Sequence, residues 1–326
     1  MISNKENFMM LMHGQIPAFL PKYDLIGWRM GGNPFGGKTA DGYNQDEFGI
    51  VYQPTEDGLG GALPKVDFVL LDDITRWRDV IKTPDVNSID WEKYAKEQMS
   101  KRDTVNEPVI MAAGDFFIKL MNFMTFTEGL CALVEEPEEC SALFDYMSDY
   151  YLDLLKKYFH YFKPDVIRLG DDIAADSMPF IDLKTYRTQI KPFHKKLADF
   201  IRENEYPMLM HCCGVCDMFI DDWVEMGVTG WEPAQAGNDF VGIKKKYNNK
   251  FAIFGGWDST GPISLESTDE EMRAAVINYV DTLAPGGGFA YYARVAHAGN
   301  REFTDRRNAI CDEIYETYAK DWYKNH

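Results

Sequence analysis

Several features that define other classes of protein are scarce or missing in this sequence. No apolar run approaches the roughly 20 residues that a helix needs to cross a bilayer, so we expect no membrane span. The N-terminus has no basic region leading into an apolar core, so we expect no signal peptide and a cytoplasmic protein. The six cysteines are too few and too clustered for a disulfide scaffold in 326 residues, which fits a reducing compartment.

Basic residues are also scarce relative to acidic ones. The chain has 34 Lys and Arg against 52 Asp and Glu, a formal net charge of −18. Such a surface repels phosphate backbones and anionic membranes, so nucleic-acid and membrane binding are disfavoured. One short basic run, Lys244 to Lys246, lies in a helical pattern, and we expect it to be a solvated helix face.

What the sequence does have is a regular alternation of short apolar runs and longer helical patterns. This rhythm predicts an α/β protein with a parallel sheet and crossover helices. Helical spacing is clearest over residues 143–158 and 272–283, and a last helix is expected from about residue 305. Strands are expected at residues 108–112, 165–169, 206–211, 228–231, 251–255 and 288–293.

Units at this frequency favour a (β/α)8 TIM barrel. An open doubly wound sheet is the rival, but no Gly-x-Gly-x-x-Gly opens a helix after an early strand. Residues 29–57, rich in Gly, Asn, Asp and aromatics, predict a long loop or short hairpin lobe that covers the site. We therefore expect a single domain over residues 1–326, in which residues 1–65 form an N-terminal lobe.

The strongest chemical signal is His211-Cys212-Cys213-Gly214, at the end of an apolar run. Residues two apart on a strand share a face, so His211 and Cys213 can converge on one ion. An imidazole nitrogen and a thiolate suit Zn²⁺, whereas the alternative is a buried polar strand end with an inert cysteine. Cys216, which completes a C-x-x-C with Cys213, begins a helical pattern and is expected to be structural.

Other polar residues follow the predicted strands, and in a barrel they would share one rim. Asp171 and Asp172 close a strand together, and we expect one to be catalytic and the other a structural cap, without assigning which. His297 is a candidate third zinc ligand, although a lone histidine is more often structural. Further candidates for the metal or the substrate are Asp115, Glu232 and Asp258.

These motifs resemble the uroporphyrinogen decarboxylase superfamily over nearly the whole chain. The resemblance lies in residues 165–172, 186–194, 211–214, 225–228, 254–258 and 284–298, and the start of the chain, residues 5–14 with Pro17 and Pro21, resembles the opening helix and turn of the family. It implies the (β/α)8 barrel and one of two chemistries. One branch decarboxylates porphyrinogens without a cofactor, and the other consists of zinc methyltransferases that exchange a methyl group with a corrinoid protein.

The residues favour the methyltransferase branch. Decarboxylases of the family grip substrate carboxylates through an N-terminal Arg-Gln-Ala-Gly-Arg segment, of which this chain keeps only Arg29. The methyltransferases bind zinc through His-x-Cys and a later cysteine. Here His211 and Cys213 match the pair, whereas His297 stands at the later position.

The sequence thus predicts a zinc enzyme that moves a methyl group between a small methylated substrate and the Co(I) corrinoid (cobalamin) of a partner protein. Zn²⁺ would polarise the heteroatom that carries the methyl group. Aromatic residues crowd the predicted lobe and favour a methoxylated aromatic donor, hence O-demethylation. A metal-free decarboxylase and a non-catalytic binding barrel are the alternatives, and the oligomeric state, a homodimer included, stays open.

Overall fold

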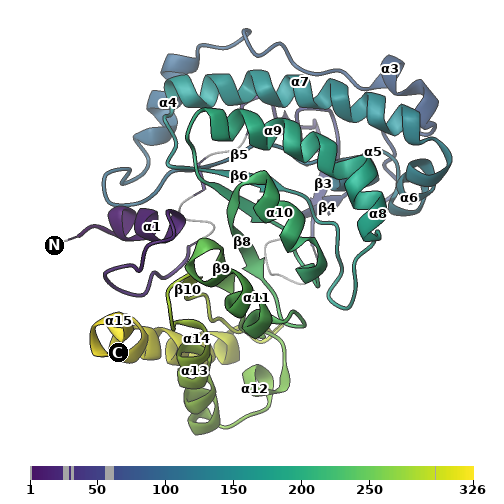
Figure 1. Ribbon diagram of the computed structural model, residues 1–326. Coiled ribbons are helices and arrows are strands. Elements are labelled where there is room, and N and C mark those ends of the chain that lie inside the picture. Colours follow the sequence, from purple (N-terminus) through teal and green to yellow (C-terminus); the bar gives the residue numbers. More distant parts are fainter. Residues whose placement is uncertain (1, 25–28, 31–32, 56–61, 298) are drawn as a thin grey trace.

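A computed structural model describes residues 2–24, 29–30, 33–55, 62–297 and 299–326. Its central feature is a six-stranded parallel sheet, in the spatial order β10-β9-β8-β7-β6-β5, with helices packed outside it (Figure 1). All six strands expected from the sequence are present. They are β5 (Ile110–Ala112), β6 (Val166–Gly170), β7 (Met208–His211), β8 (Val228–Ala234), β9 (Ala252–Gly255) and β10 (Phe289–Ala290).

Helices connect these strands as crossover units. The expected stripe over 143–158 lies in α7, a 25-residue helix that starts with Pro137, where a missing N–H costs no hydrogen bond. The other principal helices are α1 (Asn4–Met12), α4 (Trp91–Met99), α5 (Phe117–Phe123), α6 (Phe126–Glu135), α7 (Pro137–Tyr161), α9 (Lys191–Glu203), α10 (Ile220–Met226), α11 (Phe240–Tyr247), α13 (Asp269–Leu283) and α14 (Arg301–Ile314). Short helices are α3 (Trp77–Val80), α8 (Leu183–Thr185), α12 (Pro262–Leu265) and α15 (Trp322–Asn325).

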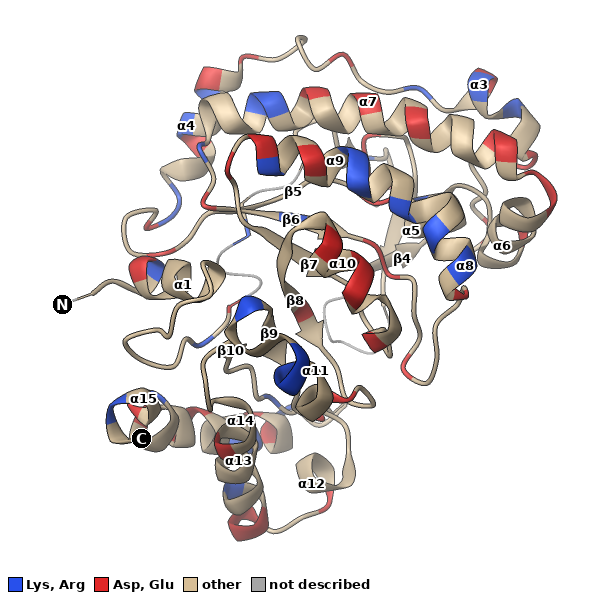
Figure 2. Cartoon of the chain, viewed as in Figure 1, with Lys and Arg blue, Asp and Glu red and all other residues tan. Residues whose placement is uncertain are grey.

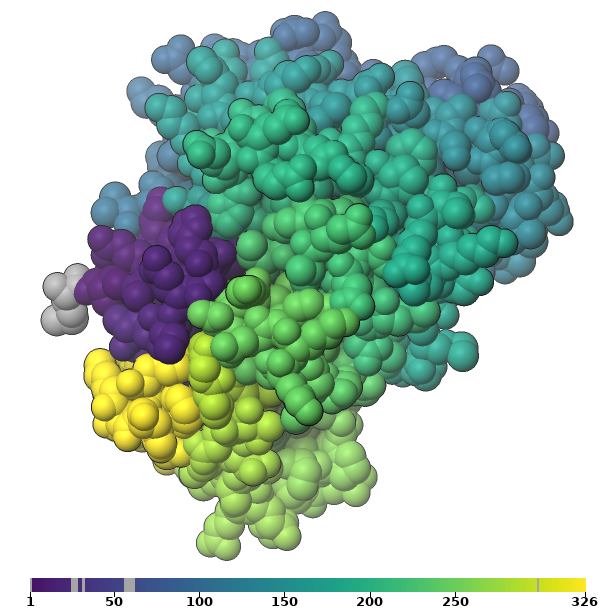
Figure 3. Space-filling model, viewed as in Figure 1, coloured from purple at the N-terminus to yellow at the C-terminus, as the bar shows by residue number. Residues whose placement is uncertain are grey.

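The sheet curls, and the N-terminal segment contacts both of its edges. Lys22 forms a parallel bridge with Tyr291 just after β10, and Arg29 forms one with Ile110 at the start of β5. Inward-facing side chains from β5, β6, β7, β9 and β10 share one core with helix α1. A sheet whose first and last strands contact the same short segment has the arrangement of a barrel. Figure 3 shows the N-terminal residues packed between the C-terminal helices and the barrel.

Strands within residues 37–54 and 62–64 form a separate antiparallel sheet, in the order β1-β2-β3-β4. Its strands are β1 (Gly37–Lys38), β2 (Asn44–Gln45), β3 (Val51–Pro54) and β4 (Ala62–Pro64). The hairpin lobe expected over 29–57 is therefore a small sheet that extends to Pro64. The turn between β2 and β3 is built on Asp46, whose Oδ1 accepts the N–H groups of Phe48 and Ile50.

A buried ion pair joins this lobe to the barrel. The Nζ of Lys119, on α5, lies 2.9 Å from Asp46 Oδ2, and the two side chains are 10% and 12% exposed. Buried charges are costly unless paired, so the lobe and α5 depend on each other.

The basic run is not the fully solvated face expected from the sequence. Figure 2 shows basic residues on α11. Lys245 and Lys246 are exposed, and Lys246 pairs with Asp221. Lys244 is half-buried, donates to the carbonyl of Gly287, and has its pKa lowered by desolvation to about 8.

In the described part of the chain, no single helix is long and apolar enough to span a membrane. Only the pair α5 and α6 together meets those limits, and the two helices are bent by 116° relative to each other.

The Lys119–Asp46 pair yields a stability prediction. Asp46→Ala should lower the free energy of unfolding by about 3 kcal/mol, because it leaves the buried ammonium with only the 4.0 Å contact of Glu47 and removes the acceptor of the turn. Urea denaturation would measure the change. Asp41→Ala, at an exposed position of the same lobe, is the control and should stay within about 0.5 kcal/mol of wild type. Equal stability of both variants would contradict this account.

Candidate metal centre

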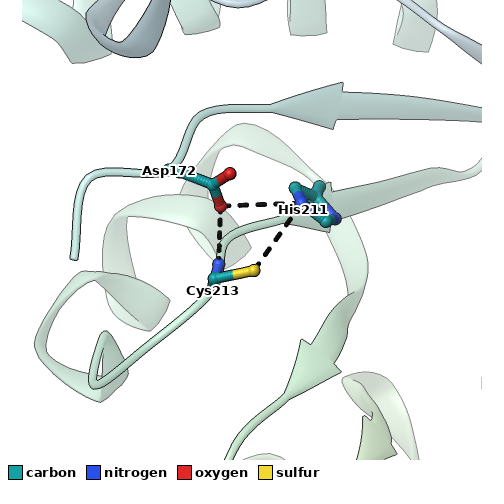
Figure 4. Close-up of side chains that lie close together, drawn as sticks. All are labelled: Asp172, His211 and Cys213. Atoms are coloured by element: carbon teal, nitrogen blue, oxygen red, sulfur yellow. Dashed lines mark hydrogen bonds and ion pairs between the residues drawn. The ribbon is translucent and has the colours of Figure 1, made fainter. Parts of the chain in front are cut away.

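Three side chains with metal-ligating atoms converge at the C-terminal ends of β6 and β7. Asp172, His211 and Cys213 each offer one such atom, and these atoms all lie within 4.8 Å of one another (Figure 4). His211 Nε2 is 3.5 Å from Asp172 Oδ1 and 4.0 Å from Cys213 Sγ. Because β6 and β7 are parallel neighbours, their polar ends meet at one edge of the sheet.

Strand register and one tight turn explain this convergence. Gly170 pairs with His211 in the sheet, which puts Asp172 beside Cys213, and the Cys213 N–H donates to Asp172 Oδ1 at 2.8 Å. The chain then turns at Gly214, whose φ is +85°. A Cβ there would fall 2.1 Å from the carbonyl oxygen of Ala175, so only glycine allows the turn to lie this close to the loop after β6.

The second nitrogen of His211 is held by a buried carboxylate. Glu232, on β8, is fully buried, and its Oε1 lies 2.9 Å from His211 Nδ1. The same oxygen accepts a 2.6 Å hydrogen bond from Arg168 Nε, on β6. A carboxylate that fixes one imidazole nitrogen orients the other, and this is how histidine ligands are commonly prepared for metals.

The pKa values follow from this charge arrangement. Desolvation lowers the pKa of His211, but the negative charge of Glu232 and the hydrogen bonds of Asp172 and Cys213 together outweigh it and hold that pKa well above its usual value. Desolvation would raise the pKa of Asp172, yet the hydrogen bond and charge of His211 bring it down to about 2. Burial raises the pKa of the Cys213 thiol.

The paired aspartates have different surroundings. Asp171 is buried and accepts the N–H groups of Phe116, Phe117 and Ile118 at 2.7–3.0 Å, so it caps the start of α5. Its Oδ2 is also 3.3 Å from Nε2 of His194, which is buried as well. Asp172 instead faces His211 and Cys213. The geometry thus favours Asp171 as the structural member of the pair.

Among the described residues, the remaining candidates are not members of this three-residue group. His297 does not join the three-residue group: it is exposed, and its ring packs against Phe303 at 5.6 Å. Asp258 is exposed and accepts the N–H of Thr260, as a turn residue does. Asp115 lies next to β6, since a Cβ on Gly170 would fall 2.3 Å from its Oδ1.

Cys212 and Cys216, which lie near Cys213 in the sequence, are both buried, and Cys216 has the structural position expected from the sequence. Cys212 is fully buried in the main core, and its Sγ is not among the converging ligand atoms. Cys216 is buried directly before the turn Asp217–Phe219 and α10, and its Sγ contacts the carbonyl of Gly214. Neither sulfur is available to the centre, although the sequence places both within a few residues of Cys213.

Comparison with known proteins adds the family. The profile of uroporphyrinogen decarboxylase (URO-D) matches residues 84–294, about two thirds of the chain. The chain belongs to the uroporphyrinogen decarboxylase family. The matched span contains Asp172, His211 and Cys213, but neither Arg29 nor His297. The family fold is the TIM barrel, which confirms the fold expected from the sequence.

Among solved structures, a methyltransferase from Methanosarcina mazei is similar to this chain, with a TM-score of 0.61 and 11% sequence identity. The similarity covers 97% of this chain and 100% of that one, so the two share their fold from end to end. A search of curated proteins found no match.

The two aspartates should respond differently to substitution. Asp171→Ala should lower the free energy of unfolding by about 3 kcal/mol, because three buried N–H groups lose their acceptor. Asp172→Ala should lower stability less than Asp171→Ala does, since this side chain is 36% exposed and accepts one backbone N–H, that of Cys213, besides its pairing with His211, but it should weaken metal binding. Urea denaturation and zinc titration of both variants would measure this split, and the reverse pattern would exchange their roles.

Glu232 should control the affinity for zinc without touching the ion. Glu232→Gln removes the charge that orients His211 and should weaken zinc binding about 10- to 100-fold. Competition with a chromophoric chelator would measure it. Glu97→Gln, exposed on α4, is the matched control and should bind zinc like wild type. Unchanged affinity in a folded Glu232→Gln protein would refute the role.

Proposed function

We propose that this protein is a zinc-dependent methyltransferase that moves a methyl group between a small methylated substrate and the Co(I) corrinoid of a partner protein. The observation that carries the proposal is the convergence of Asp172, His211 and Cys213 at the mouth of the barrel. The shared fold with a methyltransferase from Methanosarcina mazei supports the choice of this branch of the family.

The donor atoms fit zinc in kind and in spacing. Nitrogen, sulfur and carboxylate oxygen are the usual ligands of Zn²⁺, and three of them leave a fourth position for a substrate atom. In a tetrahedral site with ordinary bond lengths, ligand atoms lie about 3.3–3.6 Å apart. The 3.5 Å from His211 to Asp172 meets this spacing, and the 4.0 Å to Cys213 needs only a small inward movement. Asp172 thus takes the place that the sequence gave to His297.

The protein's own residues have distinct parts in the reaction. His211, Cys213 and Asp172 would hold the ion, and Glu232 would keep His211 directed at it. When bound, Zn²⁺ supplies a Lewis acid that draws electron density from the heteroatom carrying the methyl group. The sequence contains no Asp-x-His-x-x-Gly motif of a corrinoid-binding module, so the corrinoid would come from a separate protein.

The geometry bears on the methyl donor as well. The sequence favoured an aromatic methyl ether because of the aromatic residues in the lobe. In the structure, Phe48 packs against Phe123 and Tyr150, and Phe35 packs against Trp91. Trp28 lies outside the described residues. These rings fill the core between the lobe and the barrel, so we propose only a small methylated substrate and leave O-demethylation as one form of it.

Decarboxylation is the second candidate, because the family match favours it. A porphyrinogen carries several carboxylates and calls for several guanidinium partners. Arg29 is the only arginine kept from the carboxylate-gripping segment, and Arg168 is already engaged with Glu232. Methyl transfer therefore remains the better-supported reaction.

Metal analysis combined with methyl transfer to reduced cobalamin would test the proposal. Wild-type protein should bind about one zinc per chain. It should also transfer a methyl group from a small methylated substrate to Co(I), and the change in the cobalamin absorption spectrum would measure this transfer. His211→Ala and Cys213→Ala should lose both properties, because each removes a ligand.

Two controls separate the ligand sets. Cys131→Ala removes an exposed cysteine and should change neither property. His297→Ala should keep its zinc if Asp172 is the third ligand. Loss of zinc in that variant would instead identify His297 as the third ligand. Release of carbon dioxide from a porphyrinogen by metal-free protein would reject methyl transfer altogether.

A further inference from the structure

A small charged cavity lies where β5, the lobe and α7 meet. Its volume is about 190 Å³. Its walls include Tyr151 and Tyr158 from α7, and its polar lining consists of Arg29, Asn33, Glu47, Asp115 and Lys119. Pockets for drug-sized ligands measure about 300–1,000 Å³, so this cavity suits a much smaller molecule and excludes a tetrapyrrole.

Two opposite charges face this cavity without neutralising each other. Within the described part of the chain, neither the Asp115 carboxylate nor the Arg29 guanidinium forms an ion pair or a side-chain hydrogen bond. They are therefore also too far apart to pair directly. Unpaired charges of opposite sign on one small cavity are complementary to a ligand that carries both signs.

A second carboxylate adds to the acidic side. Lys119 pairs closely with Asp46 at 2.9 Å and more loosely with Glu47 at 4.0 Å, so Glu47 is only weakly engaged by this ammonium. The Glu47 side chain is 11% exposed. Asp115 and Glu47 can thus both act on a cationic group, and the tyrosine rings provide walls that tolerate one.

We propose that this cavity binds a small zwitterion of the amino-acid type, with its ammonium group toward Asp115 and Glu47 and its carboxylate on Arg29. A simple cation would leave Arg29 unmatched, and a simple anion would meet two repelling carboxylates. A neutral aromatic ether would desolvate all three charges without compensation.

The cavity adjoins the candidate metal centre. A Cβ on Gly170 would fall 2.3 Å from Asp115 Oδ1, and Gly170 pairs in the sheet with His211, so Asp115 lies beside the strand that neighbours the strand of His211. An N-methylated zwitterion held here would present its methyl group near the metal. Its role as methyl donor rests on the proposed function, whereas its binding does not.

Calorimetric titration of the full-length protein would test the proposal. The probes are N,N-dimethylglycine, which carries both charges, dimethylamine, which lacks the carboxylate, methoxyacetate, which lacks the ammonium, and 2-methoxyphenol. Dimethylglycine should bind at least about tenfold more tightly than the other three. Arg29→Gln and Asp115→Asn should each weaken it about tenfold or more, whereas Glu92→Gln, exposed on α4, should not.

Equal or tighter binding of dimethylamine, methoxyacetate or 2-methoxyphenol would overturn the proposal, as would no binding of dimethylglycine to folded wild-type protein. Running the titrations with and without zinc separates the two hypotheses. Zwitterion binding without any methyl transfer would sink the proposed function alone. Zinc-dependent transfer from another donor, without zwitterion binding, would sink the cavity proposal alone.

Discussion

The buried carboxylate of Glu232 is the constraint on which the centre of this protein depends. It has no contact with solvent, yet one of its oxygens lies within hydrogen-bond distance of both Arg168 and His211. Burying an isolated carboxylate costs several kcal/mol, and only well-placed partners offset that cost. Since the three residues come from β6, β7 and β8, the same contacts that neutralise Glu232 also fix the relative positions of three neighbouring strands.

The position of this carboxylate also determines how the side chains at the rim of the barrel are oriented. Glu232 directs the free nitrogen of His211 toward Asp172 and Cys213, and Gly214 lets the loop carry Cys213 to the same point. The lobe is attached by a similar device, the buried pair of Lys119 and Asp46. In both places a buried charged side chain joins two elements of the fold. Its hydrogen bonds and ion pairs require one defined distance between those elements, whereas apolar packing alone would allow several.

Family membership and chemistry are separate conclusions for this chain. The family is named for decarboxylation, but a barrel fold hosts many reactions, and the function has to be argued from the side chains at its mouth. Those side chains are a histidine, a cysteine and an aspartate around one point, with a single arginine kept from the carboxylate-gripping segment. These residue types could hold a metal ion, which is the ground of the proposed function, whereas a polyanion would call for several cationic partners.

The sequence by itself determined the six strands, the long helices and the His211–Cys213 pair, because these depend on local periodicity. It did not identify the segment around Lys22 and Arg29 that bridges the sheet edges, since single bridges leave no periodic signal. Nor could it distinguish Asp171 from Asp172, or Asp172 from His297 as the neighbour of His211. Those distinctions depend on which strand ends meet in space and which N–H groups each carboxylate reaches, and only the tertiary structure decides that.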